Sequence, residues 1–328
     1  MDREDELGEV AARYAFAVTP VLAALMDAHD PADPIARQFM PDARELLRAP
    51  EELSDPIGDD AHAPAPGVVH RYPDRVLLKP VHVCPAYCRF CFRREMVGPG
   101  KRPALTPKEI EAAFAYIEGH PEIWEVIVTG GDPFLLSPRR AAALTRRLES
   151  IAHVKVIRWH TRMATVDPAR ITEAFVRAIR SEKAVYVAVH ANHPREFTPQ
   201  ARAALARMAD AGLALVSQSV LLRGVNDDVD TLAALMRSFV EARVKPYYLH
   251  HPDLAPGTAH FRVGVAEGQA LVRALRDAVS GLCQPAYVID IPGGVSKALA
   301  SPGDVRAEID GHSVRGRDGR WRPYPPRV

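Results

Sequence analysis

The sequence predicts an α/β protein built on a partial (β/α)6 barrel with an N-terminal helical extension. Two observations support this prediction. From Arg71 onward, short β-branched apolar runs alternate with stretches rich in Ala, Leu and Arg, a pattern typical of βαβ units around a parallel sheet. Six strand–helix pairs occur in sequence and one more apolar run follows them. Six pairs are too few for a closed eightfold barrel, so we expect an open one.

The predicted strands are apolar along most of their length, as expected for strands that are buried on both faces. They are residues 76–83, 124–129, 154–159, 184–190, 214–221 and 244–250, and residues 286–291 form the further run. Helix starts are visible between them. Thr106-Pro-Lys-Glu109 matches a capping box, and Ser137-Pro and Asp167-Pro offer a similar start.

Three segments are predicted along the chain. Residues 1–70 form a helical extension, with helices at 9–27 and 34–47 and a connector at 55–67 that is rich in Pro, Asp and Ala. Residues 71–300 form the barrel. Residues 301–328 form a tail rich in Arg, Gly and Pro, to which we assign no structure; packing on the body, fraying and contact with a neighbouring subunit are the alternatives.

The composition excludes several classes of protein. In 328 residues, 42 Lys and Arg stand against 41 Asp and Glu, which gives a formal net charge of +1 and no electrostatic footprint for a nucleic-acid partner. Apolar stretches fall well short of the ~20 residues that cross a membrane, and the first ten residues are acidic, unlike a signal peptide. We therefore expect a cytoplasmic protein with no membrane or nucleic-acid partner.

Three of the 4 cysteines, Cys84, Cys88 and Cys91, follow the first predicted strand with the spacing C-x3-C-x2-C. Three thiolates on one loop can hold three corners of a 4Fe-4S cluster and leave the fourth iron open to a small molecule. The alternative is a zinc knuckle with His82 or Cys283 as the fourth ligand.

This loop resembles the signature of radical S-adenosylmethionine (SAM) enzymes, in which the open iron binds SAM and cleaves it to a 5′-deoxyadenosyl radical. Gly130-Gly131-Asp132 ends the second predicted strand and is similar to the Gly-rich SAM-binding stretch of that superfamily. Active sites of barrels lie at this end of the strands. The resemblance also assigns His190 and Gln218 to the SAM site.

Lys297 follows the Gly-rich turn after the last run, where its amine can reach a ligand. Taken alone, a solvated surface lysine is the commoner interpretation. Seven blocks change this, because in their order and spacing they resemble the lysine 2,3-aminomutase family, a branch of the superfamily that depends on pyridoxal phosphate (PLP). The blocks are residues 70–75, 84–94, 130–132, 190–194, 218–227, 245–248 and 290–297.

The resemblance implies a role for each matching residue. Lys297 becomes the Schiff-base lysine of PLP, and the residues beside the cofactor are Arg71, Tyr72 and Arg75. The substrate-binding residues are Arg93, for the α-carboxylate, and Asp253 and Asp290, for the distal ammonium group.

The implied activity is that of an isomerase, a lysine 2,3-aminomutase, which moves the amino group of L-lysine from C2 to C3. An electron donor such as flavodoxin or ferredoxin is expected. Both a monomer and a homo-oligomer are compatible with the sequence. The alternatives are β-lysine formation for elongation factor P, a mutase for arginine or glutamate, and a non-catalytic iron–sulfur or zinc protein. Two carboxylates in the substrate site disfavour glutamate.

The chain departs from the longer members of the family at two positions. Asp228 replaces a zinc-ligating cysteine, which leaves Cys283 as a buried thiol, and His250 replaces a tyrosine near PLP. These features and the length resemble the shorter branch that serves elongation factor P. The Asp290-Ile-Pro-Gly-Gly block instead resembles the longer branch.

Overall fold

A computed structural model of the chain describes residues 3–27, 29–97, 101–308 and 311–324. Its centre is a sheet whose strands follow one another in chain order. The strands are β1 (Val68–Tyr72), β2 (Arg75–Val81), β3 (Glu125–Gly130), β4 (Val156–Thr161), β5 (Ala184–His190), β6 (Ala214–Val220), β7 (Lys245–His250), β8 (Ala286–Asp290) and β9 (Lys297–Leu299). Strands β2 to β8 are parallel, whereas β1 and β9 are antiparallel edge strands. All seven predicted strands are confirmed within two residues at each end, and the two edge strands are additional.

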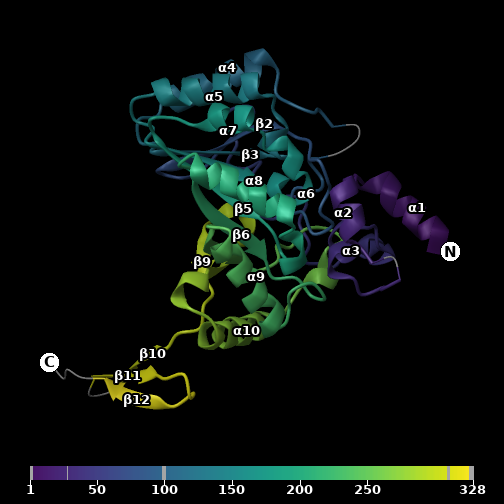
Figure 1. The fold of residues 1–328 in the computed structure, drawn as a ribbon, viewed down its shortest axis with the longest axis vertical. Helices are drawn as coiled ribbons and strands as arrows, with labels where there is room; N and C mark the ends of the chain where they lie inside the picture. The colour runs from purple at the N-terminus through teal and green to yellow at the C-terminus, as the bar shows by residue number, and fades with distance from the viewer. Residues whose placement is uncertain (1–2, 28, 98–100, 309–310, 325–328) are drawn as a thin grey trace.

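Helices connect the parallel strands and pack on the outside of the sheet (Figure 1). They are α4 (Pro107–Glu118), α5 (Pro138–Ser150), α6 (Met163–Val166), α7 (Glu173–Ile179), α8 (Pro199–Asp210), α9 (Val229–Glu241) and α10 (Val265–Ala278). Among the described residues, β2 and β8 do not pair with each other, so the sheet stays open as a half-barrel. The predicted partial (β/α)6 barrel is therefore confirmed.

The helices begin largely where the sequence predicts. Thr106 and Glu109 form the capping box of α4, and the Ser137 side chain caps α5. Asp167 is the exception, because its side chain makes no capping hydrogen bond and only a 3-10 turn follows it. Helix α7 instead begins behind Thr172, whose side chain accepts from the N–H of Phe175.

The two predicted N-terminal helices are each interrupted. The observed elements are α1 (Arg3–Arg13), α2 (Pro20–Leu25), α3 (Pro34–Phe39) and the 3-10 turn η1 (Ala43–Leu46). Helix α1 ends at Arg13, and α2 begins seven residues later behind the Thr19 cap, with Pro20 in its first turn, where the missing N–H costs no hydrogen bond. The Thr19 hydroxyl also donates to the Val166 carbonyl (2.5 Å), which attaches the extension to α6.

The tail, to which no structure is assigned from the sequence, is folded in its described part. It forms a separate antiparallel sheet of β10 (Val305–Glu308), β11 (Gly311–Arg315) and β12 (Trp321–Tyr324), which lies beyond α10 (Figure 1). The Arg306 guanidinium packs over the Trp321 ring at 4.4 Å, and Asp304 pairs with Arg276 of α10 (3.0 Å). These long-range contacts order a segment whose composition alone favours irregular structure.

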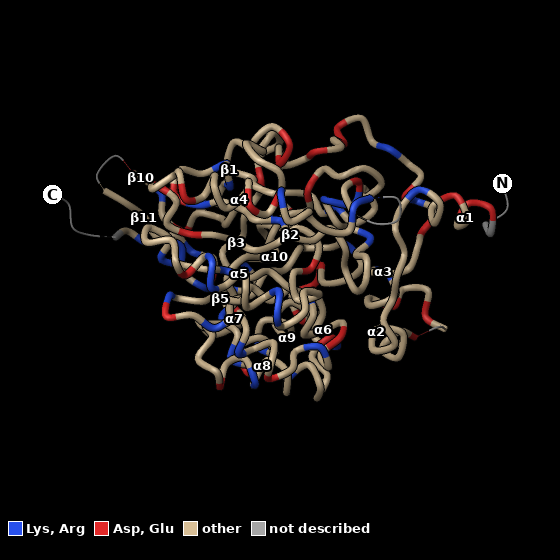
Figure 2. Tube along the Cα trace, turned by 90° about the horizontal axis from the view of Figure 1, so that it is seen from above, with Lys and Arg blue, Asp and Glu red and all other residues tan. Residues whose placement is uncertain are grey.

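Figure 2 shows basic and acidic residues intermingled over the barrel, in agreement with the near-zero net charge. No helix in the described part of the chain combines the length and apolar character that crossing a membrane requires.

Candidate functional site

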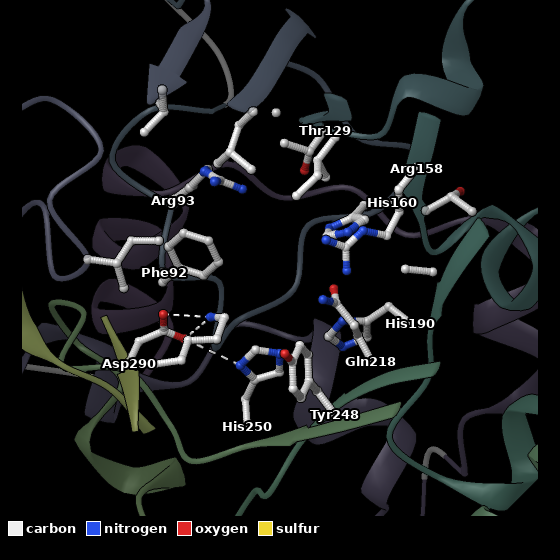
Figure 3. A pocket seen from close by; sticks show the side chains of 18 of the residues that line it. Phe92, Arg93, Thr129, Arg158, His160, His190, Gln218, Tyr248, His250 and Asp290 are labelled. Atoms are coloured by element: carbon white, nitrogen blue, oxygen red, sulfur yellow. Dashed lines mark hydrogen bonds and ion pairs between the residues drawn. The ribbon is translucent and has the colours of Figure 1, made fainter. Parts of the chain in front are cut away.

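A cavity of about 530 Å³ lies inside the half-barrel and reaches the cysteine loop. Figure 3 shows polar side chains converging on it from several strands. Every site residue predicted from the sequence lines this one cavity. These residues are Cys84, Cys88, Cys91, Gly130, Gly131, Asp132, His190, Gln218, Arg71, Tyr72, Arg75, Lys297, Arg93, Asp253 and Asp290.

The cysteine loop follows β2 and forms one wall of the cavity. Burial raises the pKa of the Cys91 thiol to about 11, and it raises the pKa of Cys84 well above its ordinary value. Thiols in such surroundings give up their protons when a bound metal supplies compensating positive charge. Cys88 accepts a hydrogen bond from Nη1 of Arg162 (3.2 Å). Three sulfur ligands beside open space fit an iron–sulfur cluster with one accessible iron.

Of the two residues considered as a fourth zinc ligand, Cys283 lies away from the cysteine loop. Cys283 is buried in the hydrophobic core, as the sequence predicts, and His82 precedes the loop. Asp228 caps α9 by accepting from the N–H of Thr231 (2.8 Å). Among the described residues, no group of three or more His, Cys, Asp or Glu side chains is placed to hold a single metal ion.

The N-terminal extension contacts and supports the cysteine loop. This contact was not predicted from the sequence. The fully buried carboxylate of Glu45 accepts from Nε of Arg89 (2.9 Å) and also pairs with Arg94. Both arginines belong to the loop, and the Gln38 carbonyl accepts from the N–H of Arg89 (2.8 Å). The shared buried carboxylate is the counter-ion of both arginines and fixes the loop against the extension.

Residues 130–132 pack tightly against the stem of the cysteine loop. Gly130 has φ of 110°, in the region that favours glycine, and a Cβ on Gly131 would lie 2.1 Å from the Val83 carbonyl oxygen. The Asp132 carboxylate accepts from the Thr161 hydroxyl (2.8 Å) and from the N–H of Arg162 (2.8 Å). The stretch therefore joins β3, β4 and the loop, and its role toward SAM stays a prediction.

His190 and Gln218 face the cavity from neighbouring strands, where they are direct partners in the register of β5 and β6. The His190 ring stacks on Phe90 of the cysteine loop at a centroid distance of 5.8 Å. Burial, together with the nearby Arg162 guanidinium, holds the pKa of His190 well below its ordinary value. A neutral imidazole has one donor and one acceptor nitrogen, so His190 is able to form hydrogen bonds with an uncharged group of a ligand.

The β1–β2 hairpin carries Arg71, Tyr72 and Arg75. The Arg75 guanidinium lies 3.8 Å from the centre of the Tyr72 ring, and Nη1 of Arg71 donates to the Ile57 carbonyl (2.5 Å). Within the described part of the chain, the Tyr72 hydroxyl and Nε of Arg71 are buried without a hydrogen-bond partner. Buried donors without partners next to cationic groups fit an anionic ligand such as a phosphate.

Lys297, Asp290 and His250 form a network at the end of β8. Nζ of Lys297 donates to both Asp290 oxygens (2.6 and 2.5 Å), and Nδ1 of His250 lies 3.4 Å from Asp290 Oδ2 (Figure 3). Asp290 is buried, which alone would raise its pKa, but these partners hold that pKa below its ordinary value. Burial, and then repulsion from Asp290, raises the pKa of Asp253 to about 7.

Arg93 is held in the cavity wall by Asp59, since its Nε lies 2.8 Å from Asp59 Oδ2. Asp59 belongs to the segment predicted as an extended connector, yet it is fully buried, and it also pairs with Lys79 (3.4 Å). The guanidinium of Arg93 is thus fixed at one side and presents its terminal nitrogens to the cavity (Figure 3).

Further side chains line the cavity although no role was predicted for them from the sequence. His160 and Arg158 enter it from β4, and Tyr248 enters it from β7 (Figure 3). Burial holds the pKa of His160 well below its ordinary value, so its ring is neutral near pH 7. One feature of the sequence could have indicated Arg158 and His160: both are polar residues inside the otherwise apolar run that forms β4.

Known proteins are similar to this chain in sequence. Residues 78–236 match the family model of the radical SAM superfamily. The chain is 41% identical over 290 residues to an L-lysine 2,3-aminomutase from Acetoanaerobium sticklandii, an alignment that covers 88% of this chain and 70% of that one. It is 38% identical over 304 residues to an L-lysine 2,3-aminomutase from Clostridium subterminale, with 93% and 73% covered. A glutamate 2,3-aminomutase from Clostridioides difficile is 34% identical over 302 residues, with 91% and 70% covered.

Proposed function

The chain belongs to the lysine 2,3-aminomutase family of the radical SAM superfamily, and from this premise we propose that it converts L-lysine to β-lysine. The observation that supports lysine as the substrate is the pair of carboxylates, Asp253 and Asp290, in the same cavity as Lys297 and the three cysteines. A distal ammonium group would be attracted by this pair, whereas a carboxylate side chain would be repelled. Glutamate is therefore disfavoured despite the related glutamate enzyme.

Each cofactor has a matching part of the cavity. We propose that the 4Fe-4S cluster is held by Cys84, Cys88 and Cys91, and that SAM binds beside it at residues 130–132, His190 and Gln218. We propose that PLP is bound covalently by Nζ of Lys297, with Arg71, Tyr72 and Arg75 around its phosphate. When bound, the cluster and SAM supply the radical that removes a substrate hydrogen, and PLP carries the amino group that moves.

The side chains of the protein would mainly orient the substrate and exclude water. Arg93, fixed by Asp59, offers its terminal nitrogens to the α-carboxylate, for which a planar guanidinium is well suited. Asp290 and Asp253 would receive the distal ammonium group at the opposite end of the substrate. Holding both ends fixes the hydrogen at C3 relative to the radical source, which is how positioning accelerates a reaction.

The test is an anaerobic assay of the reconstituted protein. Purified protein is loaded with iron, sulfide and PLP, mixed with SAM, dithionite and L-lysine, and analysed for β-lysine by mass spectrometry after derivatisation. L-arginine and L-glutamate are run in parallel. We expect β-lysine alone, and chiral analysis of this product then separates free lysine metabolism from the elongation factor P role.

Two cysteine variants make the assay specific. Cys88→Ser should abolish both cluster colour and product, whereas Cys283→Ser, which changes a core thiol outside the cavity, should keep both. If SAM is cleaved and lysine is unchanged, the substrate is wrong. If a fully loaded protein cleaves no SAM, the proposed reaction is wrong. We expect that a physiological one-electron donor, such as a flavodoxin or ferredoxin, supports the reaction in place of dithionite.

A further inference from the structure

Arg162 lies where β4 meets the cysteine loop, directly after the last residue of that strand. Its Nη1 donates to Cys88 Sγ at 3.2 Å, and its guanidinium is almost fully buried. Among the described residues, this is the one side-chain hydrogen bond to a sulfur of the cysteine loop. Arg89 and Arg94 are closer in sequence to the cysteines, but their guanidinium groups pair with Glu45 instead.

The other side of the guanidinium is held by two buried residues. Nη2 of Arg162 donates to Gln38 Oε1 (2.6 Å) and to Glu196 Oε2 (2.7 Å), and the Glu196 side chain is fully buried. The Phe39 ring lies 4.5 Å from the guanidinium carbon. These three contacts orient the Arg162 guanidinium toward Cys88.

We propose that Arg162 is a positioning residue that raises the reduction potential of the cluster through its hydrogen bond to Cys88, and that Gln38 and Glu196 hold it there. The inference rests on the proposed function, in which Cys88 ligates the cluster. A donor to a ligating sulfur withdraws electron density from it, and hydrogen bonds to sulfur are among the factors that set cluster potentials. The N-terminal extension, through Gln38, thereby takes part in the chemistry of the barrel.

The step affected is a one-electron reduction. An external one-electron donor transfers one electron to the oxidised cluster, which passes from the 2+ to the 1+ state, and no bond is formed or broken. The added electron increases the negative charge on the sulfur ligands, so the N–H···S hydrogen bond is stronger in the reduced state. Removing Arg162 also leaves the buried Glu196 carboxylate uncompensated, which disfavours the added electron further.

The experiment is a redox titration of the reconstituted cluster, followed by electron paramagnetic resonance, without SAM or PLP. Wild-type protein is compared with Arg162→Gln and with Arg158→Gln. Arg158 is the matched control because it is also buried, lines the same cavity and pairs with a glutamate, Glu125 (2.9 Å), but it donates to no cysteine. Iron and sulfide content are measured for each protein.

In Arg162→Gln we expect a more negative midpoint, with at least a tenfold lower ratio of reduced to oxidised cluster at the wild-type midpoint, which corresponds to about 59 mV for one electron. Arg158→Gln should keep the wild-type midpoint. Gln38→Leu removes one holder of Arg162 without changing a charge, and it should shift the midpoint in the same direction by less. It also serves as the test if Arg162→Gln takes up no cluster.

Unchanged midpoints in the Arg162 and Gln38 variants at full cluster content overturn the role of Arg162 and leave the proposed function intact. An equal shift in Arg158→Gln also overturns it, because any buried cation would then suffice. If wild-type protein binds no cluster at all, the proposed function fails together with this inference.

Discussion

The ammonium group of Lys297 sits between the two carboxylate oxygens of Asp290, at 2.6 and 2.5 Å. The two residues are register partners in the antiparallel pair of β8 and β9. The turn between them contains Gly293 and Gly294 with φ of 79° and 81°, which brings the strands together within seven residues. Lys297, the proposed PLP lysine, is thus paired with Asp290, the carboxylate that we assign to the distal ammonium group of the substrate. When PLP binds to Nζ of Lys297, this ion pair would be lost and Asp290 would become available to the substrate.

Asp290→Ala should weaken L-lysine binding 10- to 100-fold, since a lost charged hydrogen bond costs about 1.5–3 kcal/mol. PLP uptake should change far less, because the proposed phosphate site lies on the β1–β2 hairpin. Calorimetry on PLP-loaded protein measures the first quantity and absorbance measures the second. Norleucine, which has the same chain without the distal amine, is the control ligand, and its affinity should not change. Equal losses for lysine and PLP would count against the ammonium role of Asp290.

Glu45→Gln should destabilise the cofactor-free protein by about 3–5 kcal/mol, because it leaves Arg89 and Arg94 buried without their counter-ion. Urea unfolding measures this free energy. The matched control is Glu111→Gln, an exposed residue that pairs with Arg147 at 3.2 Å, and it should change stability by less than about 0.5 kcal/mol. Similar effects of the two variants would contradict the bracing role of Glu45.

The central strands could be predicted because burial on both faces leaves a continuous apolar run. The edge strands could not, since β1 includes His70, Arg71 and Tyr72, and β9 has only three residues. An edge strand is defined by its pairing partner more than by its own composition. The same reason applies to β10–β12, whose register depends on contacts such as Arg306 on Trp321.

In the site, the residues in motifs could be predicted and their supporting partners could not. Cys88 belongs to a local spacing pattern, whereas Gln38 contacts Arg162 across 124 positions of sequence. Asp59 lies in a Pro-rich segment that resembles a solvated connector, and only the fold buries it against Arg93. Buried polar pairs of this kind depend on tertiary contacts, which a single sequence does not display.

Gly131→Ala should reduce cluster uptake and lower the melting temperature. A Cβ at this position would lie 2.1 Å from the Val83 carbonyl oxygen, so the backbone that leads into Cys84 must move. Overpacking of this type costs about 1–3 kcal/mol. Gly281→Ala is the control, because a Cβ there meets no atom within 4 Å. Iron per chain after reconstitution should fall for the first variant only, and a full iron content in Gly131→Ala would show that the loop tolerates the shift.

Asp253→Asn should stabilise the cofactor-free protein, and more strongly at pH 8 than at pH 5. The pKa of Asp253 is raised to about 7 in the folded protein, above its ordinary value of 3.8, so the folded state binds the proton more tightly than the unfolded state. Stability contributed by the protonated carboxyl is therefore fully present below about pH 3.8 and is lost as the pH rises from there to about 7. Asparagine keeps the shape of the protonated form and does not ionise.

Melting temperatures of both proteins at pH 5 and pH 8 measure this difference. Part of the gain from Asp253→Asn should be present at pH 5, because the unfolded wild-type chain already ionises at Asp253 above pH 3.8, and the gain should grow by several degrees at pH 8. L-lysine binding to the PLP-loaded protein should move in the opposite direction, since the variant loses a carboxylate that faces the ammonium group. A gain in melting temperature that is equal at the two pH values would mean that burial of charge at Asp253 is not its cause.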